Sequence, residues 1–538
     1  MKFLLFLFTV LLSVSSLAEV KMSALFSDGM VLQQKQAVPV WGWAPAGTAV
    51  SVSFAGQTKE TKADNNGKWM LKLDALTASA KGAEMTVKVG SESKTIKDIL
   101  VGEVWICSGQ SNMDFTMAQI SKDARDKRQQ PIPEYVAKET QTAKDSLYRQ
   151  IAVPRMTSAF KESTGFQGKW LSVDPQNTPG FTATGYFFGR ELRKKLNVPV
   201  GLIKCAWGGT RVEPWVPMSK FQSNDALKQY YDAETSAIKE QLAKWDDAKV
   251  KANYEKQVAK WKETVKKLKD AGKKKFPRKP RMAGKPDKRN TIPSTLYNGM
   301  IYQLAPFAVK GAIWYQGESN RKHMPEKYEQ HFSALIEAWR EVWAQDKFYF
   351  YWCQLAQFQA PNAEPLSEDA WTDVCNAQRL VLKLKDTGMA VLNDIGEAGD
   401  IHPRNKVDAG KRLSLWAFKQ AYGETDLVSS GPLYKSHTVE GSKFVIKFDS
   451  AGSGLMVGKK NLLDPTVPAD GPLKRFQICG EDKVWKWADA KITGKDTVEV
   501  SHKDIAKPVE VRYAWSPNAE GANLYNKEGL PASLFKTK

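Results

Sequence analysis

The sequence has few cysteines and, beyond its first residues, no long apolar run. Its 538 residues include five cysteines, whose spacing fits neither a disulfide framework nor a zinc site. Three of them, Cys107, Cys205 and Cys353, lie in apolar runs and are expected to be buried core residues. No later apolar run approaches 18 residues, so we expect a mature protein without a membrane span. No metal and no cofactor is expected.

The first 18 residues have the pattern of a secretory signal. Lys2 is followed by an apolar stretch from Phe3 to Leu12 and by small residues up to Ala18. No cysteine follows this segment at once, which argues against a lipid anchor there. We therefore expect an exported protein, periplasmic or extracellular.

The net charge of +20 is a local feature. Residues 239–290 hold 19 Lys and Arg against 7 Asp and Glu, and supply twelve of the twenty excess charges. A basic face with interleaved aromatic residues is absent, so nucleic acid is not the expected partner. This stretch fits either a solvated surface hairpin or an electrostatic patch that gathers acidic glycans.

Hydrophobic periodicity divides the chain into three regions after the signal. Residues 19–98 and 426–538 alternate like strands and are expected to form two β-sandwiches. Residues 99–425 alternate strand and helix patterns, which predicts an α/β domain with a doubly wound parallel sheet. Within it, residues 225–290 predict a basic, helical insertion.

The most informative segment is Trp105 to Met113, which reads Trp-Ile-Cys-Ser-Gly-Gln-Ser-Asn-Met after an apolar run. A buried strand ends there, Gly109 permits a sharp turn, and Ser111 sits on the turn. Open α/β sheets place their ligands at this edge, and a nucleophilic hydroxyl needs this geometry. The alternative is a strand–turn–helix join in which Ser111 only caps a helix.

Three further segments have the same character. They are Ala206 to Trp215 (Ala-Trp-Gly-Gly-Thr-Arg-Val-Glu-Pro-Trp), Gly311 to Asn320 (Gly-Ala-Ile-Trp-Tyr-Gln-Gly-Glu-Ser-Asn), and Gly399 to Asn405 (Gly-Asp-Ile-His-Pro-Arg-Asn). Together the four segments resemble the sequence blocks of the sialate O-acetylesterases, a branch of the SGNH (GDSL-type) serine esterases. Similar segments near Leu25, Pro293 and Asn523 extend the resemblance over most of the chain.

The resemblance implies a flavodoxin-like SGNH sheet with accessory β regions and a role for each block. Ser111 is the nucleophile and His402 the base, and the oxyanion hole combines the Ser111 backbone N–H with Gly209 and Asn320. Such an oxyanion hole needs backbone or neutral side-chain donors, which these residues supply.

The histidine content supports the same base. Only five histidines are present, and His402 occupies a loop after a strand, whereas His323 is the one rival near a block. The family usually carries an aspartate three residues before the base, but here that position is Gly399. Asp400 is assigned as the orienting acid, with Asp394, Glu397 or a Ser–His dyad as alternatives.

The remaining polar residues of the blocks have two interpretations. Arg211 is assigned to substrate binding, where it would pair with a substrate carboxylate, but it could equally pair with Glu213. Gln316 is also assigned to substrate binding, although with Gln110 and Glu318 it could instead hold the loops together.

The expected function is removal of O-acetyl groups from a sugar, most of all 9-O-acetyl sialic acid. Carbohydrate esterases that act on acetylated xylan share similar short blocks, so that substrate is the alternative. A carbohydrate-binding protein with an inactive esterase core and a lipid esterase are further alternatives. The expected partner is an acetylated carbohydrate, and the sequence does not indicate an oligomeric state.

Overall fold

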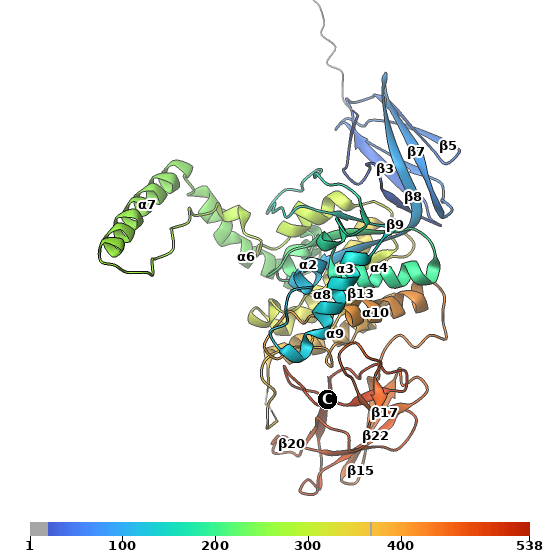
Figure 1. Ribbon diagram of the computed structural model, residues 1–538, viewed down its shortest axis with the longest axis vertical. Helices are drawn as coiled ribbons and strands as arrows, with labels where there is room; N and C mark the ends of the chain where they lie inside the picture. The colour runs from blue at the N-terminus through green and yellow to red at the C-terminus, as the bar shows by residue number, and fades with distance from the viewer. Residues whose placement is uncertain (1–19, 366–367, 538) are drawn as a thin grey trace, which may run out of the picture.

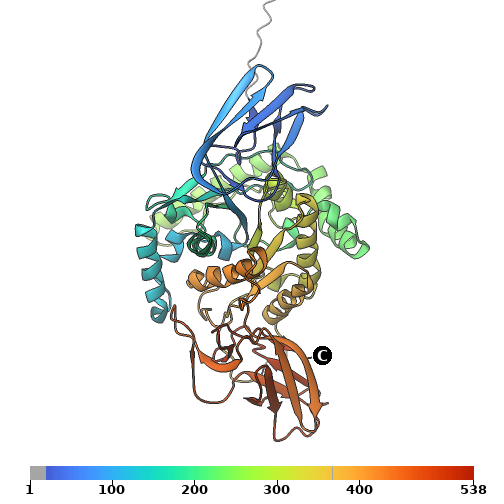
Figure 2. The same ribbon diagram turned by 90° about the vertical axis from the view of Figure 1, so that its right-hand side faces the viewer.

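The computed structural model describes residues 20–365 and 368–537, so the expected signal segment lies outside it. Figure 1 shows a β-rich region at one end, an α/β region in the middle and a second β-rich region at the other end. Figure 2, turned by 90°, shows the same three regions stacked along the long axis. The fold is therefore of mixed α/β type with several sheets.

The middle region is built on a mixed sheet whose central strands are parallel. In spatial order the strands are β10 (Leu171–Val173), β9 (Asp145–Ala152), β11 (Val200–Ala206), β8 (Glu92–Gly109), β12 (Gly311–Tyr315), β13 (Tyr349–Cys353) and β14 (Thr387–Ala390). If these five strands are numbered by their order along the chain, with β8 as strand 1, their spatial order from β11 to β14 is 2-1-3-4-5. The loops that follow β8, β11, β12 and β14 therefore meet at one edge of the sheet.

Helices cover both faces of this sheet. On one face, Trp105 of β8 packs edge-on against Phe188, 5.1 Å between ring centroids. On the other, Trp314 of β12 lies 6.1 Å from Phe332. The helices concerned are α4 (Ala183–Leu196) and α10 (Lys406–Trp416) on the first face, and α8 (Tyr328–Trp343) with α9 (Ala370–Leu380) on the second. Because both faces are covered, the strands are apolar throughout rather than alternating.

The N-terminal region contains two sheets with alternating buried and exposed residues. One is β1 (Lys21–Met22), β3 (Val38–Trp43) and β6 (Lys68–Leu73); the other strands are β2 (Val31–Gln33), β4 (Ala49–Phe54), β5 (Gln57–Lys62) and β7 (Ser79–Val89). β7 and β4 join the central sheet through β8, which pairs with β7 at its start and with β11 and β12 at its end. This long strand crosses the boundary expected at residue 98.

The C-terminal region holds three small antiparallel sheets. They are β15 (Leu433–Glu440), β16 (Lys443–Asp449), β22 (Thr497–Ser501) and β21 (Asp489–Ile492); β18 (Val467–Pro468), β17 (Leu455–Lys459) and β24 (Leu524–Asn526); and β20 (Lys486–Trp487), β19 (Phe476–Cys479), β23 (Glu510–Tyr513) and β25 (Phe535–Lys536). β15 starts a few residues after the boundary expected at residue 426.

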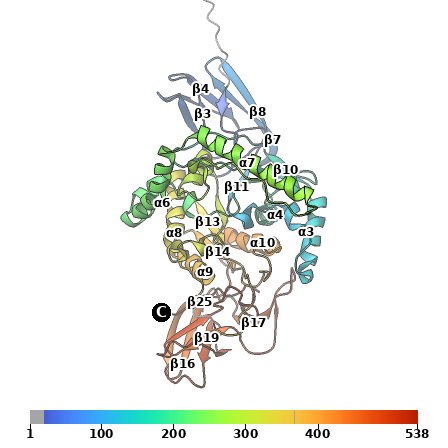
Figure 3. The ribbon, with the colours of Figure 1, turned by 90° about the vertical axis from the view of Figure 1, so that its left-hand side faces the viewer.

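The basic insertion contains α6 (Asp225–Ala243) and α7 (Asp247–Asp270). α6 buries one face, whereas α7 has no buried residue and extends away from the rest of the molecule (Figure 1). Seen from that side, α7 lies in front of the other elements (Figure 3). The chain returning from α7 passes along it, where the Trp261 indole N–H donates to the Pro277 carbonyl at 2.8 Å.

All five cysteines are buried and unpaired, as expected of core residues. Among residues 20–365 and 368–537, no helix is long and apolar enough to cross a membrane. In the same residues, no three His, Cys, Asp or Glu side chains are arranged to hold a metal ion.

Candidate active site

The Ser111 hydroxyl lies at the turn between β8 and the short helix α1 (Ser111–Asp114). Gly109, the last residue of β8, has a φ of +130°, and a Cβ there would lie 2.3 Å from the Tyr315 carbonyl oxygen. Only glycine allows β8 and β12 to approach this closely while the chain turns. The sequence therefore places Ser111 at the carboxyl edge of the sheet, as expected.

His402 reaches Ser111 from the loop between β14 and α10. Its Nε2 lies 2.9 Å from the Ser111 Oγ, within hydrogen-bond distance. The ring of Phe115 packs against the imidazole in an edge-on arrangement, with 4.5 Å between centroids. The contact with Ser111 fits a base that removes the serine proton.

The other four histidines lie elsewhere. The His323 Nε2 lies 3.2 Å from the Tyr230 hydroxyl, and His331 is buried on α8. His437 lies on β15, and His502 follows β22 in the C-terminal region. Within the described part of the chain, only His402 contacts the Ser111 hydroxyl.

Asp400 lies beside the second ring nitrogen of His402. Its Oδ1 is 3.4 Å from Nδ1 and accepts a hydrogen bond of 3.0 Å from the backbone N–H of His402. That backbone bond is a side-chain turn spanning two residues, which brings the carboxylate next to the ring despite the shorter spacing. Arg125 and Arg404 lie 3.5 and 3.7 Å from Oδ2.

The two alternative acids are engaged elsewhere. Asp394 forms a two-point ion pair with Arg412, at 2.6 and 2.8 Å. Glu397 accepts the backbone N–H of Arg404 at 2.6 Å. Of the three candidate acids, the structure brings Asp400 to the imidazole.

The charge environment keeps His402 neutral over a wide pH range. Burial lowers the pKa of His402 to about 4, the charge of Lys406 adds to this shift, and Asp400 opposes it. A neutral imidazole is the form that accepts a proton from Ser111.

Lys406 belongs to a buried chain of polar groups, the Lys406 network, which consists of Lys406, Asn112 and Glu318. The Lys406 ammonium donates to the Asn112 amide oxygen at 2.6 Å and to the Pro403 carbonyl at 2.7 Å. The Asn112 amide nitrogen in turn donates to Glu318 and to the Ile401 carbonyl. Burial lowers the pKa of Lys406 to about 8 and raises the pKa of Glu318 above its ordinary value. This network connects the nucleophile turn to the base loop.

Gly209 lies in the loop that follows β11, on the other side of Ser111. Gly209 has a φ of +76° and is exposed. A Cβ at this position would meet no atom within 4 Å. At neighbouring Gly208, a Cβ would lie 3.3 Å from that of Ser111, so this loop packs directly against the nucleophile. The Ser111 N–H begins helix α1, where backbone N–H groups have no partner within the helix. These positions are compatible with the expected role of the Ser111 and Gly209 backbone N–H groups in the oxyanion hole.

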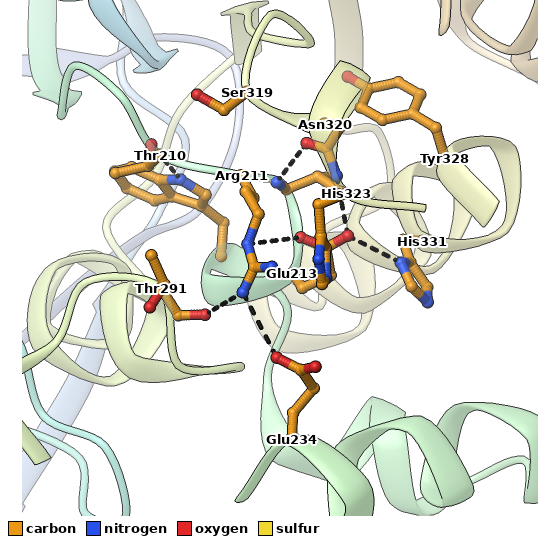
Figure 4. Close-up of polar contacts among 12 residues, drawn as sticks. Thr210, Arg211, Glu213, Glu234, Thr291, Ser319, Asn320, His323, Tyr328 and His331 are labelled. Atoms are coloured by element: carbon orange, nitrogen blue, oxygen red, sulfur yellow. Dashed lines mark hydrogen bonds and ion pairs between the residues drawn. The ribbon is translucent and has the colours of Figure 1, made fainter. Parts of the chain in front are cut away.

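The Asn320 amide is engaged inside the protein, with one of its two N–H groups bonded to Glu213. Asn320 is fully buried, and its amide nitrogen donates to Glu213 Oε1 at 2.8 Å (Figure 4). Its oxygen accepts from the Val212 N–H at 3.0 Å and from the Gln316 amide at 2.7 Å. In this arrangement Asn320 holds two loops together, which does not support the predicted donation to the oxyanion.

Gln316 is likewise buried and fully engaged, so its predicted contact with substrate is not supported. Its amide nitrogen also donates to the Thr210 carbonyl and to Gln110, each at 3.2 Å, and its oxygen accepts from the Tyr328 hydroxyl at 2.9 Å. Gln110 further accepts the Ser319 N–H at 3.2 Å. The second interpretation, that Gln110 and Gln316 hold the loops together, fits these contacts.

Arg211 forms its contacts within the protein rather than facing a ligand. Its guanidinium donates to the Thr291 carbonyl at 2.8 Å and lies 3.9 Å from Glu213 and 3.5 Å from Glu234 of α6 (Figure 4). Because these groups already surround the guanidinium, the predicted pairing with a substrate carboxylate is not supported, and the alternative pairing with Glu213 is the one observed.

Glu213 is the centre of a second buried group, the Glu213 network, which consists of Arg211, Glu213, Asn320 and His331. Its Oε1 lies 3.1 Å from the Nδ1 of His331, and its side chain is fully buried. Burial alone would raise the pKa of Glu213, but His331 and Arg211 outweigh it and hold the pKa below its ordinary value. The sequence suggested Glu213 only as a partner of Arg211, and it indicated no role for His331 or Lys406, whose partners Glu213 and Asn112 lie far away in the chain.

Comparisons with known proteins identify the family of this chain. The sequence model described as "Carbohydrate esterase, sialic acid-specific acetylesterase" matches residues 101–278 and 284–414, more than half of the chain. The chain belongs to this family. The protein is therefore an esterase, and the matched residues include all four sequence blocks.

Individual relatives cover nearly the whole chain. The sialate O-acetylesterases of Homo sapiens and Rattus norvegicus are 26% and 28% identical, over 96% and 95% of this chain and 92% of each relative. A crystal structure of a carbohydrate acetylesterase from Xanthomonas citri is 34% identical, with a TM-score of 0.76, and covers 96% of this chain and 99% of that one. The similarity therefore includes both β-rich regions as well as the α/β region.

Proposed function

We propose that this esterase hydrolyses O-acetyl esters on sugars, with Ser111 as nucleophile and His402 as general base. The observation that carries the proposal is the 2.9 Å contact between Ser111 Oγ and His402 Nε2, at the sheet edge where the four blocks meet. The strand order around β8 supports the further inference that this region is of SGNH type.

In the first half-reaction, Ser111 Oγ attacks the acetyl carbonyl carbon while His402 Nε2 takes the hydroxyl proton. The oxygen of the tetrahedral intermediate carries the negative charge, and the backbone N–H groups of Ser111 and Gly209 stabilise it. The C–O bond to the sugar then breaks, His402 returns the proton to the sugar oxygen, and an acetyl-serine remains. Asp400 holds the imidazole orientation and stabilises its transient positive charge.

In the second half-reaction, water takes the place of the sugar. His402 removes a proton from this water, which attacks the acetyl-serine carbonyl. The Ser111 oxygen leaves as the new acid forms, and His402 returns the proton to it. Acetate is released and the free enzyme is restored, so one water is consumed for each ester cleaved.

The substrate that we propose first is 9-O-acetyl sialic acid, on the strength of the family description and of the relatives' names. Acetylated xylan is the alternative, because the similar Xanthomonas citri protein is described only as a carbohydrate acetylesterase. Arg211 does not serve as the partner of a sialic acid carboxylate in this proposal, since Glu213 and Glu234 occupy it. From the pattern of residues 1–18 we also infer export from the cytoplasm.

The test is acetate release from 9-O-acetyl sialic acid and from acetylated xylan, by the wild type and by Ser111→Ala. We expect the wild type to prefer the sialic acid ester and Ser111→Ala to release no acetate above background. Preference for acetylated xylan would change the proposed substrate but leave the proposed ester hydrolysis unchanged. Sugar binding without any acetate release by the wild type would instead indicate an inactive esterase core.

A further inference from the structure

A cavity that is distinct from the Ser111 site opens between the N-terminal β-rich region and the α/β region. Its volume is about 260 Å³, close to the lower end of the range for ligand pockets. Its walls include Trp41 and Trp43 of β3, Met70 of β6, and Tyr302 and Gln303, which precede β12. Because β12 and β8 run parallel and Ser111 follows the end of β8, this cavity lies toward the opposite edge of the sheet.

The aromatic walls of the cavity are held in fixed positions. Trp41 is buried and packs edge-on against Phe26, with 4.7 Å between ring centroids. Trp43 and Tyr302 are half-buried and pack against the core while also lining the cavity. Rings that are already ordered lose little conformational freedom when a ligand stacks on them.

Polar residues also line the cavity. Gln303 is 5% exposed, and its amide nitrogen donates to the Gly299 carbonyl at 2.7 Å. Its amide oxygen is buried and accepts no hydrogen bond from the described residues. A buried acceptor without a partner is costly, so a ligand hydroxyl that reached this oxygen from the cavity would remove that cost. Lys68, at the start of β6, adds an exposed ammonium at the rim.

We propose that this cavity binds a pyranose ring of a polysaccharide or glycan chain without cleaving it. The C–H groups of a pyranose form an apolar face that packs on indole and phenol rings, and its hydroxyls would supply the donor that Gln303 lacks. The described lining contains no arrangement of nucleophile and base like that of Ser111 and His402. The site would hold a polymeric substrate near the enzyme and raise the effective concentration of its acetyl groups at Ser111.

The test is isothermal titration of the full-length protein with two unacetylated probes, xylohexaose as a neutral chain and sialyllactose as an acidic one. We expect saturable binding of at least one probe, and a loss of affinity of about tenfold or more in Trp43→Ala. Trp245→Ala, which removes a half-buried tryptophan between α6 and α7, is the matched control and should bind as the wild type does. Lys68→Gln distinguishes the two probes, because it should weaken the binding of sialyllactose and leave the binding of xylohexaose unchanged.

Since neither probe carries an ester, this result does not depend on the proposed esterase chemistry. Turnover of p-nitrophenyl acetate should stay unchanged in Trp43→Ala, and Tyr302→Ala gives a second variant if Trp43→Ala has a lowered melting temperature. Binding of neither probe by the wild type would overturn the proposal. Equal binding by the wild type and by both folded variants would overturn it as well, since the sugar would then sit elsewhere, for instance at Ser111.

Discussion

Buried charges lie on both sides of Ser111, but the groups bonded to these charges differ between the two sides. In the Glu213 network, the carboxylate lies next to the opposite charge of Arg211 and the imidazole of His331, so its charge is compensated within the network. In the Lys406 network, the two hydrogen bonds of the ammonium both go to neutral oxygens, those of Asn112 and Pro403, and Glu318 is connected to it only through Asn112. The positive charge of Lys406 therefore acts on its neighbour His402.

This difference indicates a division of labour. A compensated buried charge fixes the positions of the groups bonded to it and has little influence beyond them. An ammonium bonded only to neutral oxygens changes the pKa of a nearby base. We therefore infer that the Glu213 network fixes the shape of the loop after β11, and that the Lys406 network sets the protonation of His402. The following variants break or sharpen this comparison.

Replacing the base itself should have the largest effect. His402→Ala should lower kcat by about 10⁴ or more, because Ser111 would lose its proton acceptor. His323→Ala is the matched control and should keep nearly full activity, since His323 contacts Tyr230 and not Ser111. Turnover of p-nitrophenyl acetate measures both variants, and a strong loss in His323→Ala alone would reverse the assignment of the base.

Asp400→Asn should have the next largest effect. The amide would present the wrong partner to Nδ1 and favour the wrong tautomer, a change that costs serine proteases about 10⁴ in kcat. Because the observed distance to Nδ1 is long, at 3.4 Å, we expect a loss of about 10² to 10⁴ in steady-state kcat. Asp394→Asn serves as the comparison for the alternative acid. A mild effect of Asp400→Asn beside an inactive His402→Ala would indicate a Ser–His dyad.

Glu213→Gln should lower kcat through geometry alone. It keeps the shape of the side chain but removes the charge that holds Arg211 and His331. We expect kcat to fall about tenfold to a hundredfold, as for small misplacements of catalytic groups, with the acid limb of the pH profile unmoved. Glu234→Gln is the control, because Glu234 is partly exposed and contacts only the outer side of Arg211. A shifted acid limb in Glu213→Gln would contradict the division of labour.

Lys406→Met should change the pH dependence more than the maximal rate. His402 must be neutral to accept a proton, so activity falls as the pH drops through the pKa of His402. Lys406 lowers that pKa, and removing its charge should raise it, which moves the acid limb of kcat to higher pH by about one unit. Lys406→Arg keeps the charge and should leave the limb in place. An unmoved limb in a folded Lys406→Met protein would show that burial alone sets the pKa of His402.

Shortening the insertion should have the smallest effect. α7 has no buried residue, whereas α6 supplies Glu234 to Arg211. Removing residues 247–283 and closing the gap with a short glycine linker should leave turnover of a small neutral ester unchanged. If the insertion gathers acidic glycans, activity on them should fall at low ionic strength and much less at high salt. Equal activity on acidic glycans at every salt concentration would support a plain surface hairpin.

The sequence predicted the positions of strand ends better than it predicted the contacts between them. Ser111, Gly209, Asp400 and His402 could be placed because each follows an apolar strand, and parallel strands bring those ends to one edge. The hydrophobic pattern does not indicate β9, because Asp145–Ala152 is rich in polar residues. The structure explains why: Arg149 is buried there by donating to the carbonyls of Gly29 and Asp98.

The roles of Asn320, Arg211 and Gln316 could not be predicted for a related reason. Each is polar and lies in a block, which fits contact with a substrate as well as contact with another loop. Only the fold reveals that Glu213 and Gln110, more than a hundred residues away from Asn320 and Gln316, take up their hydrogen bonds. Buried polar networks depend on such distant partners, and a single sequence carries no local pattern for them.

The most direct test of the account is covalent labelling of the nucleophile with diisopropyl fluorophosphate, followed by peptide mass spectrometry. We predict one adduct, on Ser111, with loss of activity in proportion to labelling. Ser111→Ala should not be labelled, and His402→Ala should be labelled far more slowly, because its serine is no longer activated. An adduct on another serine that accompanies inactivation, or full activity with Ser111 completely labelled, would contradict the account.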